Sequence, residues 1–327
     1  MILPTVLALL AAFTFAANNA TLRRGVVDGT LSQAMVVTLL LGTVLVWIAA
    51  LAAGGTGQLQ TFPLRSTLLF SGAGLLHFGF GRYCNYRATR AMGTVLVGPV
   101  QQTSVLITLV LAILLLGERL TALHIAGIAL IIAAPMLAAR AHAPSSFRPF
   151  KRAPEGAEAA KPAAQPATRS FRPKLGEGYL FAAFSALAYG SSPILVRQAM
   201  VDGSGMAGGL AGAALAYTAA TLGVVAIVIC QGGLARSLTM SRPTLGWYSV
   251  AGVTAAVSQV LVYMALSIAP ASVVIPIQRT SLVMRVWLAR MLNPELESFD
   301  GPVLLATVLS LIGAAALAAD PAWFGMK

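Results

Sequence analysis

The sequence predicts an all-α integral membrane protein with ten transmembrane helices, arranged as two inverted repeats of five helices each. Three observations predict this fold: the composition, a series of long apolar runs, and a repeat within the chain. Of the 327 residues, 57% are hydrophobic and 10% are charged, and the mean hydropathy is +0.81. A soluble domain usually carries about 25% charged residues, so this chain has too little polar surface to cover a water-soluble globule.

Ten apolar runs have about the length of roughly 20 residues that a helix needs to cross a bilayer. Between the fifth and sixth runs, residues 141–176 are rich in proline, alanine and basic residues. Such a stretch cannot bury a core, so we expect a flexible linker between the units 1–140 and 177–327. The ten runs are Leu3–Leu22, Met35–Ala53, Ser66–Tyr86, Thr94–Leu116, Ala122–Leu137, Gly178–Val196, Gly208–Gln231, Trp247–Ser267, Val273–Met291 and Val303–Ala319.

Several classes of function are excluded by what the sequence lacks. The two cysteines, Cys84 and Cys230, fit no metal or disulfide spacing. There is no phosphate-binding glycine loop and no serine–histidine–aspartate set, so we expect neither an enzyme nor a catalytic site, metal or cofactor. The net charge of +12 suits anionic lipid rather than nucleic acid. The expected partners are a small-molecule solute and membrane lipids, and the expected state is a monomer or homodimer.

The basic residues between the runs predict the orientation. When the spans alternate across the membrane, fourteen Lys and Arg residues fall on the linker's side and four on the other. Basic loops favour the cytoplasm, so we expect a multi-pass protein of the cell inner membrane with a cytoplasmic linker and both termini outside. The fourteen are Arg23, Arg24, Arg87, Arg90, eight from Arg140 to Lys174, Arg236 and Arg242, and the four are Arg65, Arg119, Arg197 and Lys327.

The second half of the chain repeats the first. Because each half has an odd number of spans, the second half must enter the membrane in the opposite orientation. Inverted repeats are typical of secondary transporters, whose substrate site lies near the midplane between the halves. A shift of 177 residues places Tyr86 on Tyr263, Pro99 on Pro276, Gln101 on Gln278, Glu118 on Glu295, Arg82 on Gln259 and Gln102 on Arg279, and a shift of 174 places Phe15 on Tyr189, Asn18 on Ser192 and Arg23 on Arg197.

Short motifs recur in both halves. The first half has Arg87-Ala-Thr-Arg-Ala-Met-Gly-Thr, Val97-Gly-Pro99 and Leu114-Leu-Leu-Gly-Glu118-Arg-Leu-Thr121, and the second has Tyr189-Gly-Ser-Ser192, Pro276 and Pro294-Glu295. With these motifs each half resembles an EamA-type unit of the drug/metabolite transporter superfamily. The resemblance implies a membrane transporter. It leaves the substrate open, because the superfamily carries amino acids, sugars, nucleotide sugars, amines and drugs.

Polar side chains inside the apolar runs are the candidate substrate-binding residues, because an unpaired polar group in hydrocarbon is costly. Hydrogen bonds between helices are the alternative role for the amides and Arg279, and Arg82 has the alternative of reaching the lipid headgroups. The candidates are Arg82, Gln101, Gln102, Tyr189, Ser192, Gln259, Tyr263, Gln278 and Arg279.

Other polar residues are predicted to serve structure. His77 is expected to bond between helices, and Asn18 and Asn19 to end the first span. Arg285 and Arg290 lie near the end of the ninth run, where we expect both to reach the headgroups. Glu118 and Glu295 are interpreted as residues that mark helix ends.

No acidic residue lies in the middle of a run, which argues against proton-driven export of cations. The basic and amide groups favour an anionic or zwitterionic solute. The predicted function is therefore a secondary transporter, an exporter or exchanger of a small polar metabolite by alternating access. The alternative is a non-transporting lipid-handling subunit or membrane sensor that retains the fold, in which the linker is the working part.

Overall fold

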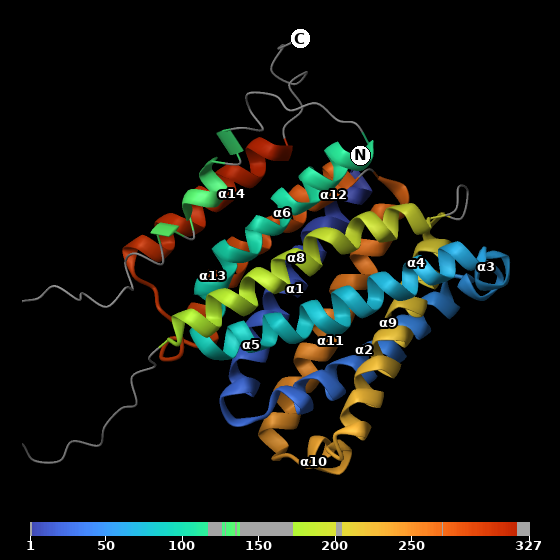
Figure 1. The fold of residues 1–327 in the computed structure, drawn as a ribbon, viewed down its shortest axis with the longest axis horizontal. Coiled ribbons are helices and arrows are strands. Elements are labelled where there is room, and N and C mark those ends of the chain that lie inside the picture. Colours follow the sequence, from blue (N-terminus) through green and yellow to red (C-terminus); the bar gives the residue numbers. More distant parts are fainter. Residues whose placement is uncertain are drawn as a thin grey trace, which may run out of the picture.

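A computed structural model gives the fold of the chain (Figure 1). It describes residues 2–116, 126–127, 129–134, 136–137, 173–200, 205–269 and 271–318, which are helical apart from short connections. Residues 126–137 are helical wherever they are described. The other helices are α1 (Ile2–Asp28), α2 (Leu31–Ala52), α3 (Gly55–Thr61), α4 (Leu64–Gly74), η1 (Leu75–Gly81), α5 (Arg82–Met92), α6 (Thr94–Leu116), α8 (Leu175–Ala199), α9 (Gly205–Cys230), α10 (Leu234–Leu238), α11 (Arg242–Ile268), α12 (Ala271–Arg279), α13 (Ser281–Leu292) and α14 (Gly301–Ala318).

Five helices in the described part of the chain are long and apolar enough to cross a membrane, namely α1, α2, α8, α9 and α11. The third predicted span is one continuous helix from Leu64 to Met92, in which the π-helix η1 separates α4 from α5. The ninth is divided at Thr280 into α12 and α13. The chain is thus an all-helical, multi-pass membrane protein, and the count of ten spans stays a prediction.

The two interrupted helices have local causes. Pro276 lies inside α12, where it has no backbone N–H to donate to the preceding turn. The next turn is tightened, because Thr280 donates its N–H to the carbonyl of Ile277 at 3.1 Å and accepts from Val283 at 3.1 Å. In the third span the π-helix widens the turn, an irregularity that is frequent at functional sites. These interruptions lie directly before Arg82 and directly after Arg279.

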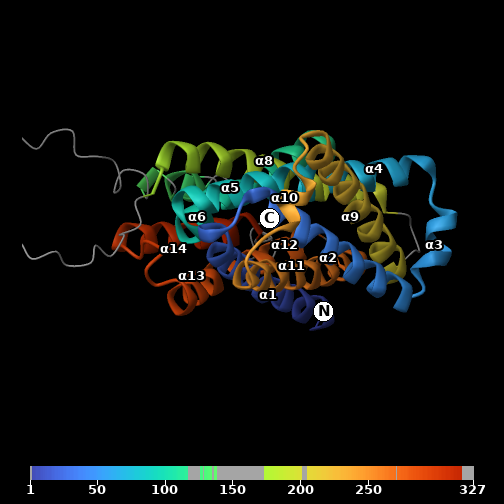
Figure 2. The same ribbon diagram turned by 90° about the horizontal axis from the view of Figure 1, so that it is seen from below.

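The long helices pack in two groups (Figure 2). On one side of the molecule α8 lies along α4, η1, α5 and α6, and on the opposite side α1 lies along α11, α12 and α13. Helices α2 and α9 pack against each other and against α11 and α4, respectively. The main apolar core forms around this contact and includes Phe70, Phe78, Tyr217 and Tyr248.

Small residues permit close approach between these helices. A Cβ atom at Gly74 of α4 would collide with the carbonyl oxygen of Ala216 in α9. A Cβ at Gly252 of α11 would lie 3.1 Å from the Cα of Thr38 in α2. Contacts of this kind hold membrane helices together without large side chains between them.

The outer faces of the helices carry large apolar side chains. Leu64 is 74% exposed, Leu222 65% and Trp287 56%. In water such a surface would be an interaction or aggregation liability. It suits contact with lipid chains, in agreement with the membrane prediction.

Three boundary predictions were wrong. Helix α1 continues to Asp28, so Asn18 and Asn19 lie inside the helix and are buried rather than ending it. Arg23 is likewise buried within α1, so it leaves the loop count, which becomes thirteen against four. Helix α8 begins at Leu175, two residues before the predicted start of the second unit at residue 177. Helix α1 extends past its apolar run because its last turns bury polar side chains against other helices.

Candidate functional site

Arg82 is buried at the junction of η1 and α5. Its side chain is 5% exposed, so it does not reach the headgroups. Nη2 donates to the Tyr217 hydroxyl of α9 at 2.9 Å, and Cζ lies 5.1 Å from the ring centre of Phe78 and 5.3 Å from that of Tyr217. Aromatic faces attract a guanidinium, but Nη1 has no hydrogen-bond partner among the described residues.

His77 and Ser192 join the third span to α8. His77 Nδ1 lies 2.6 Å from Ser192 Oγ, which confirms the predicted bond between helices. The histidine ring also packs on Tyr189, with ring centres 4.4 Å apart. Both Arg82 and Arg279 lie within electrostatic range of this ring, so the histidine marks the region where the two halves of the chain bring their arginines together.

Gln101 is the centre of a second group of polar side chains. Its Nε2 donates to Asn85 Oδ1 at 2.7 Å and to Ser185 Oγ at 3.3 Å. Its Oε1 accepts from Arg285 Nη1 at 3.0 Å. Asn85 in turn donates to Asn19 Oδ1 at 3.4 Å, so this network links α1, α5, α6, α8 and α13.

The expectation that Arg285 reaches the headgroups was wrong. Its side chain is 3% exposed and lies over the ring of Phe15, with 5.5 Å from Cζ to the ring centre. Arg290 on the same helix is exposed, as predicted. The difference is tertiary, because Arg285 faces the amide of Gln101 across the contact between α13 and α6.

Tyr189 connects the two groups. It lies one helical turn after Ser185, which binds Gln101, and its ring packs on His77. Tyr189 lies within electrostatic range of both Arg82 and Arg285. The two groups therefore form one buried polar network.

Arg279 and Gln278 end α12, next to the interruption. Both are half-buried, and Arg279 Nε has no partner among the described residues. Gln102 is buried, and its Nε2 also lacks a partner in the described part of the chain. These side chains can donate to a ligand without breaking a hydrogen bond that the structure shows.

Gln259 and Tyr263 occupy the buried face of α11. Tyr263 lies within electrostatic range of Tyr217, which binds Arg82. Within the described residues, Gln259 makes no hydrogen bond with any of the arginines. The structure thus brings Arg82, Gln101, Tyr189, Ser192 and Tyr263 close to one network, and no contact between described residues joins Gln259 or Gln278 to it.

A separate ion pair closes the end of the molecule where α1, α5 and α13 end. The carboxylate of Glu297 accepts the N–H groups of Thr94 at 2.8 Å and Val95 at 2.9 Å, the first amides of α6. It also lies 3.5 Å from Arg23 Nε. The sequence repeat had indicated Glu295 as the residue that marks this helix end, but Glu295 is exposed. Its counterpart Glu118 lies outside the described residues.

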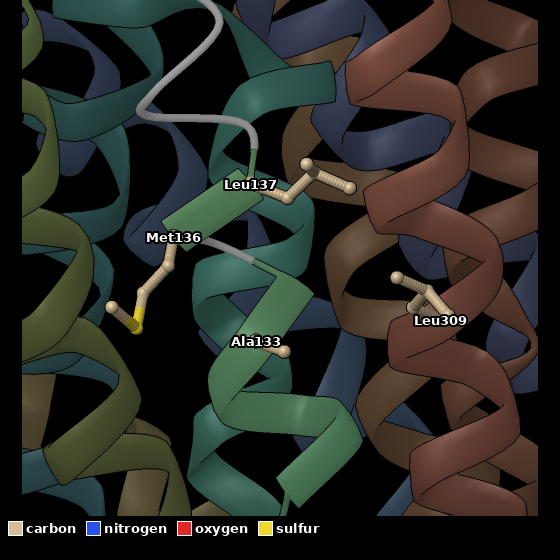
Figure 3. A pocket seen from close by; sticks show the side chains of 4 residues that line it. All are labelled: Ala133, Met136, Leu137 and Leu309. Carbon is tan, nitrogen blue, oxygen red and sulfur yellow. The ribbon is translucent and has the colours of Figure 1, made fainter.

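An apolar pocket of about 290 Å³ lies elsewhere, between residues 126–137 and α14 (Figure 3). It is lined by Ala133, Met136, Leu137 and Leu309. None of these side chains can hydrogen-bond a polar solute. The pocket therefore does not belong to the candidate site.

Known proteins resemble the chain in two ways. The model of the EamA-like transporter family matches residues 3–140. The first half therefore resembles an EamA-like transporter unit. A solved crystal structure is similar in fold, with a TM-score of 0.53 and 16% identity over 96% of this chain and 95% of the other. No curated protein sequence matches the chain.

Arg82, Gln101 and Gln102 lie in the residues that the family model matches, while Arg279 and Arg285 lie in the second half. No ion pair joins any of these arginines to a carboxylate within the described residues. Ion pairs between described residues include Glu297 with Arg23 and Glu177 with Arg87 at 2.8 Å. Within the described part of the chain, the buried or half-buried guanidinium groups of Arg82, Arg279 and Arg285 therefore form no ion pair with a carboxylate.

Sequence reasoning missed Arg285, Asn85, Ser185 and the pair of Arg23 with Glu297. A signal existed for Arg285, because a second arginine six residues after Arg279 lies in the same apolar run. Asn85 also had one, because it lies one residue before Tyr86 in a run expected to be buried. Ser185 and Glu297 had none, because their roles depend on partners distant in the sequence.

Proposed function

We propose that this chain is a secondary transporter for a small anionic or zwitterionic metabolite, working by alternating access. The proposal rests on one observation. Arg82, Arg279 and Arg285 form no ion pair with any carboxylate in the described residues. Burying an unpaired guanidinium costs several kcal/mol, which is about the free energy lost when one partner of a buried ion pair is removed. An anionic group on the solute would offset this cost through charge-assisted hydrogen bonds.

The proposed architecture is two inverted five-helix halves, residues 1–140 and 177–327, joined by the linker 141–176. A two-fold exchange of the halves would relate α1 to α8, α2 to α9, and the α4–η1–α5 helix to α11. The observed contacts fit this exchange, because α1 packs on α11 as α8 packs on α4 and α5. Likewise α2 packs on α11 as α9 packs on α4.

The interrupted helices support a site between the halves. In transporters with inverted repeats, substrate sites form where spanning helices are broken, because the freed backbone groups and nearby side chains can bind solute there. Here the π-helix η1 precedes Arg82 and the break at Thr280 follows Arg279. Each half therefore supplies one interrupted helix and at least one arginine to the same network.

The proposed location is the cell inner membrane, with the linker in the cytoplasm. The basic residues on the linker's side carry this orientation. The ion pair of Arg23 with Glu297 closes the ends of the helices on the linker's side. In the proposed cycle this end opens toward the cytoplasm to exchange the solute.

Identification of the solute begins with a comparison of metabolites inside and outside cells that lack or overproduce the protein. Compounds whose distribution reverses between the two strains are then tested with purified protein in liposomes, loaded with unlabelled compound and supplied with labelled compound outside. We expect exchange of at least one anionic or zwitterionic compound. If only cations or neutral sugars exchange, the proposed substrate class is wrong; if nothing does and the liposomes retain folded protein, the transport proposal is wrong.

A further inference from the structure

Arg285 is a buried charged residue that forms no ion pair within the described part of the chain. It is 3% exposed, its one recorded hydrogen bond goes to Gln101 Oε1, and its Nε has no partner among the described residues. The acceptor is a neutral amide, which orients the guanidinium but does not neutralise it. A purely structural arginine at such a depth would be expected to pair with a carboxylate or with several carbonyl groups.

The position of Arg285 is fixed in advance by the residues around Gln101. The Gln101 amide is held by Asn85 and Ser185 on two other helices, and Phe15 of α1 covers the guanidinium. Side chains held in this way present their donors in one direction with little loss of entropy on binding. Arrangements of this kind are typical of a binding group rather than of a mobile surface charge.

Arg285 has a different partner from that of Arg82. It donates to Gln101, whereas Arg82 donates to Tyr217. Arg279 lies before the break of the ninth span at Thr280 and Arg285 lies after it. The guanidinium groups of Arg279 and Arg285 interact electrostatically, so each adds positive potential at the other. A single carboxylate has two oxygens and pairs bidentately with one guanidinium.

We infer that the solute carries two separated anionic groups, one bound near Arg82 and Arg279 and the other by Arg285 beside Gln101. This inference rests on the proposed function and makes its substrate class narrower. A short dicarboxylate or a phosphorylated carboxylic acid has the shared chemistry. The dicarboxylate would balance two of the three positive charges, and the phosphorylated acid would balance up to all three. A zwitterion or a monoanion would leave the charge of Arg285 unmatched.

The test measures binding of small anions to purified full-length protein by the change in its thermal unfolding. The probes are succinate and glutarate, each with its monoanionic counterpart of equal chain length, butyrate and pentanoate, and 3-phosphoglycerate against glycerate. We expect at least one dianion to bind about tenfold more tightly than its monoanionic counterpart. The dicarboxylate and phosphate probes separate the two sources of the second anionic group.

Two variants remove the contribution of Arg285 in different ways. Arg285→Gln removes the charge, and Gln101→Glu keeps Arg285 but places a carboxylate against it. In both, the ratio of dianion to monoanion affinity is expected to fall to about one. Arg290→Gln, on the exposed side of the same helix, is the matched control and keeps the ratio of the parent. Gln101→Glu serves as the second test if Arg285→Gln does not fold.

The outcomes separate the inference from the proposed function. Equal binding of dianions and monoanions by the parent overturns the inference, and so does a preference that survives in both folded variants. In either case anion transport through Arg279 still stands. If no anion of either kind binds or is exchanged by the parent, the proposed function fails and the inference fails with it.

Discussion

Arg23 of α1 and Glu297 of the α13–α14 loop form a buried ion pair, with 3.5 Å between Nε and Oε1. The same carboxylate binds the first two amides of α6, and the same arginine donates to the carbonyls of Thr89 and Leu296. One pair of side chains therefore connects α1, α5, α6 and the loop before α14. In the proposed cycle, opening of this end must separate them.

The first prediction concerns this closure. Glu297→Gln removes the ion pair but leaves an oxygen that can accept from α6, so the protein should fold and its closed end should open more often. The native Cys84 is buried in α5 near this end, and Cys230→Ser leaves it as the single thiol. We expect Glu297→Gln to raise the labelling rate of Cys84 by a maleimide about tenfold, which corresponds to about 1.4 kcal/mol. The exposed Glu295→Gln is the control, and equal rates in both variants would contradict the role of Glu297.

The second prediction is a dependence of the same closure on pH. Burial raises the pKa of Glu297 to about 7, although Arg23, two backbone N–H groups of α6 and, at longer range, Arg285 act in the opposite direction. The ion pair needs the carboxylate, so it is complete above pH 7 and is lost as the pH falls below 7. We expect Cys84 in the parent to react about tenfold more slowly than in Glu297→Gln at pH 8, and at the same rate at pH 6. A ratio that does not change with pH would contradict this, because thiol ionisation cancels in the ratio.

The third prediction separates two adjacent glutamines. Gln101 makes hydrogen bonds to Asn85, Ser185 and Arg285, whereas Gln102 Nε2 has no partner in the described structure. Gln101→Ala leaves buried partners unsatisfied and should lower the free energy of unfolding by about 1–3 kcal/mol. Gln102→Ala should change stability little and reduce solute affinity by about 1 kcal/mol. Thermal unfolding and solute binding measure both, and equal destabilisation would contradict the described network.

The fourth prediction concerns orientation. A reporter inserted in the linker near Ala159 should read as cytoplasmic, and one fused after Lys327 as non-cytoplasmic. The burial of Arg23 weakens the basic count only slightly, because the linker supplies most of it. Opposite readings from both reporters would reverse the orientation without changing the fold.

Most of the helices could be predicted from sequence because apolar runs of membrane length have few alternatives. Nearly every described helix overlaps a predicted run, apart from the short helices α3 and α10. The ends were less predictable, as α1 shows, because its last turns are held by side-chain contacts such as those of Arg23 with Leu296 and Arg24 with Leu292 rather than by an apolar pattern.

The buried charges could not be predicted in the same way. Arg285 and Arg290 have the same local sequence context, but a contact 184 residues away buries the first and not the second. Glu295 and Glu297 differ for a similar reason. Gly93 has a φ of 85°, and a Cβ there would lie 2.5 Å from Glu297 Oε2, so this glycine makes room for the carboxylate. Such choices depend on packing between distant segments.

The most direct test of the account is transport by Arg279→Gln at matched membrane expression, beside the parent, Arg279→Lys and the exposed control Arg290→Gln. Arg279 Nε has no partner among the described residues and lies at the interruption of α12, where an anionic group of the solute is proposed to bind. We predict that Arg279→Gln folds and loses most transport, that Arg279→Lys recovers only part because lysine lacks the bidentate geometry, and that Arg290→Gln transports normally. Transport by Arg279→Gln at the rate and affinity of the parent would contradict the account.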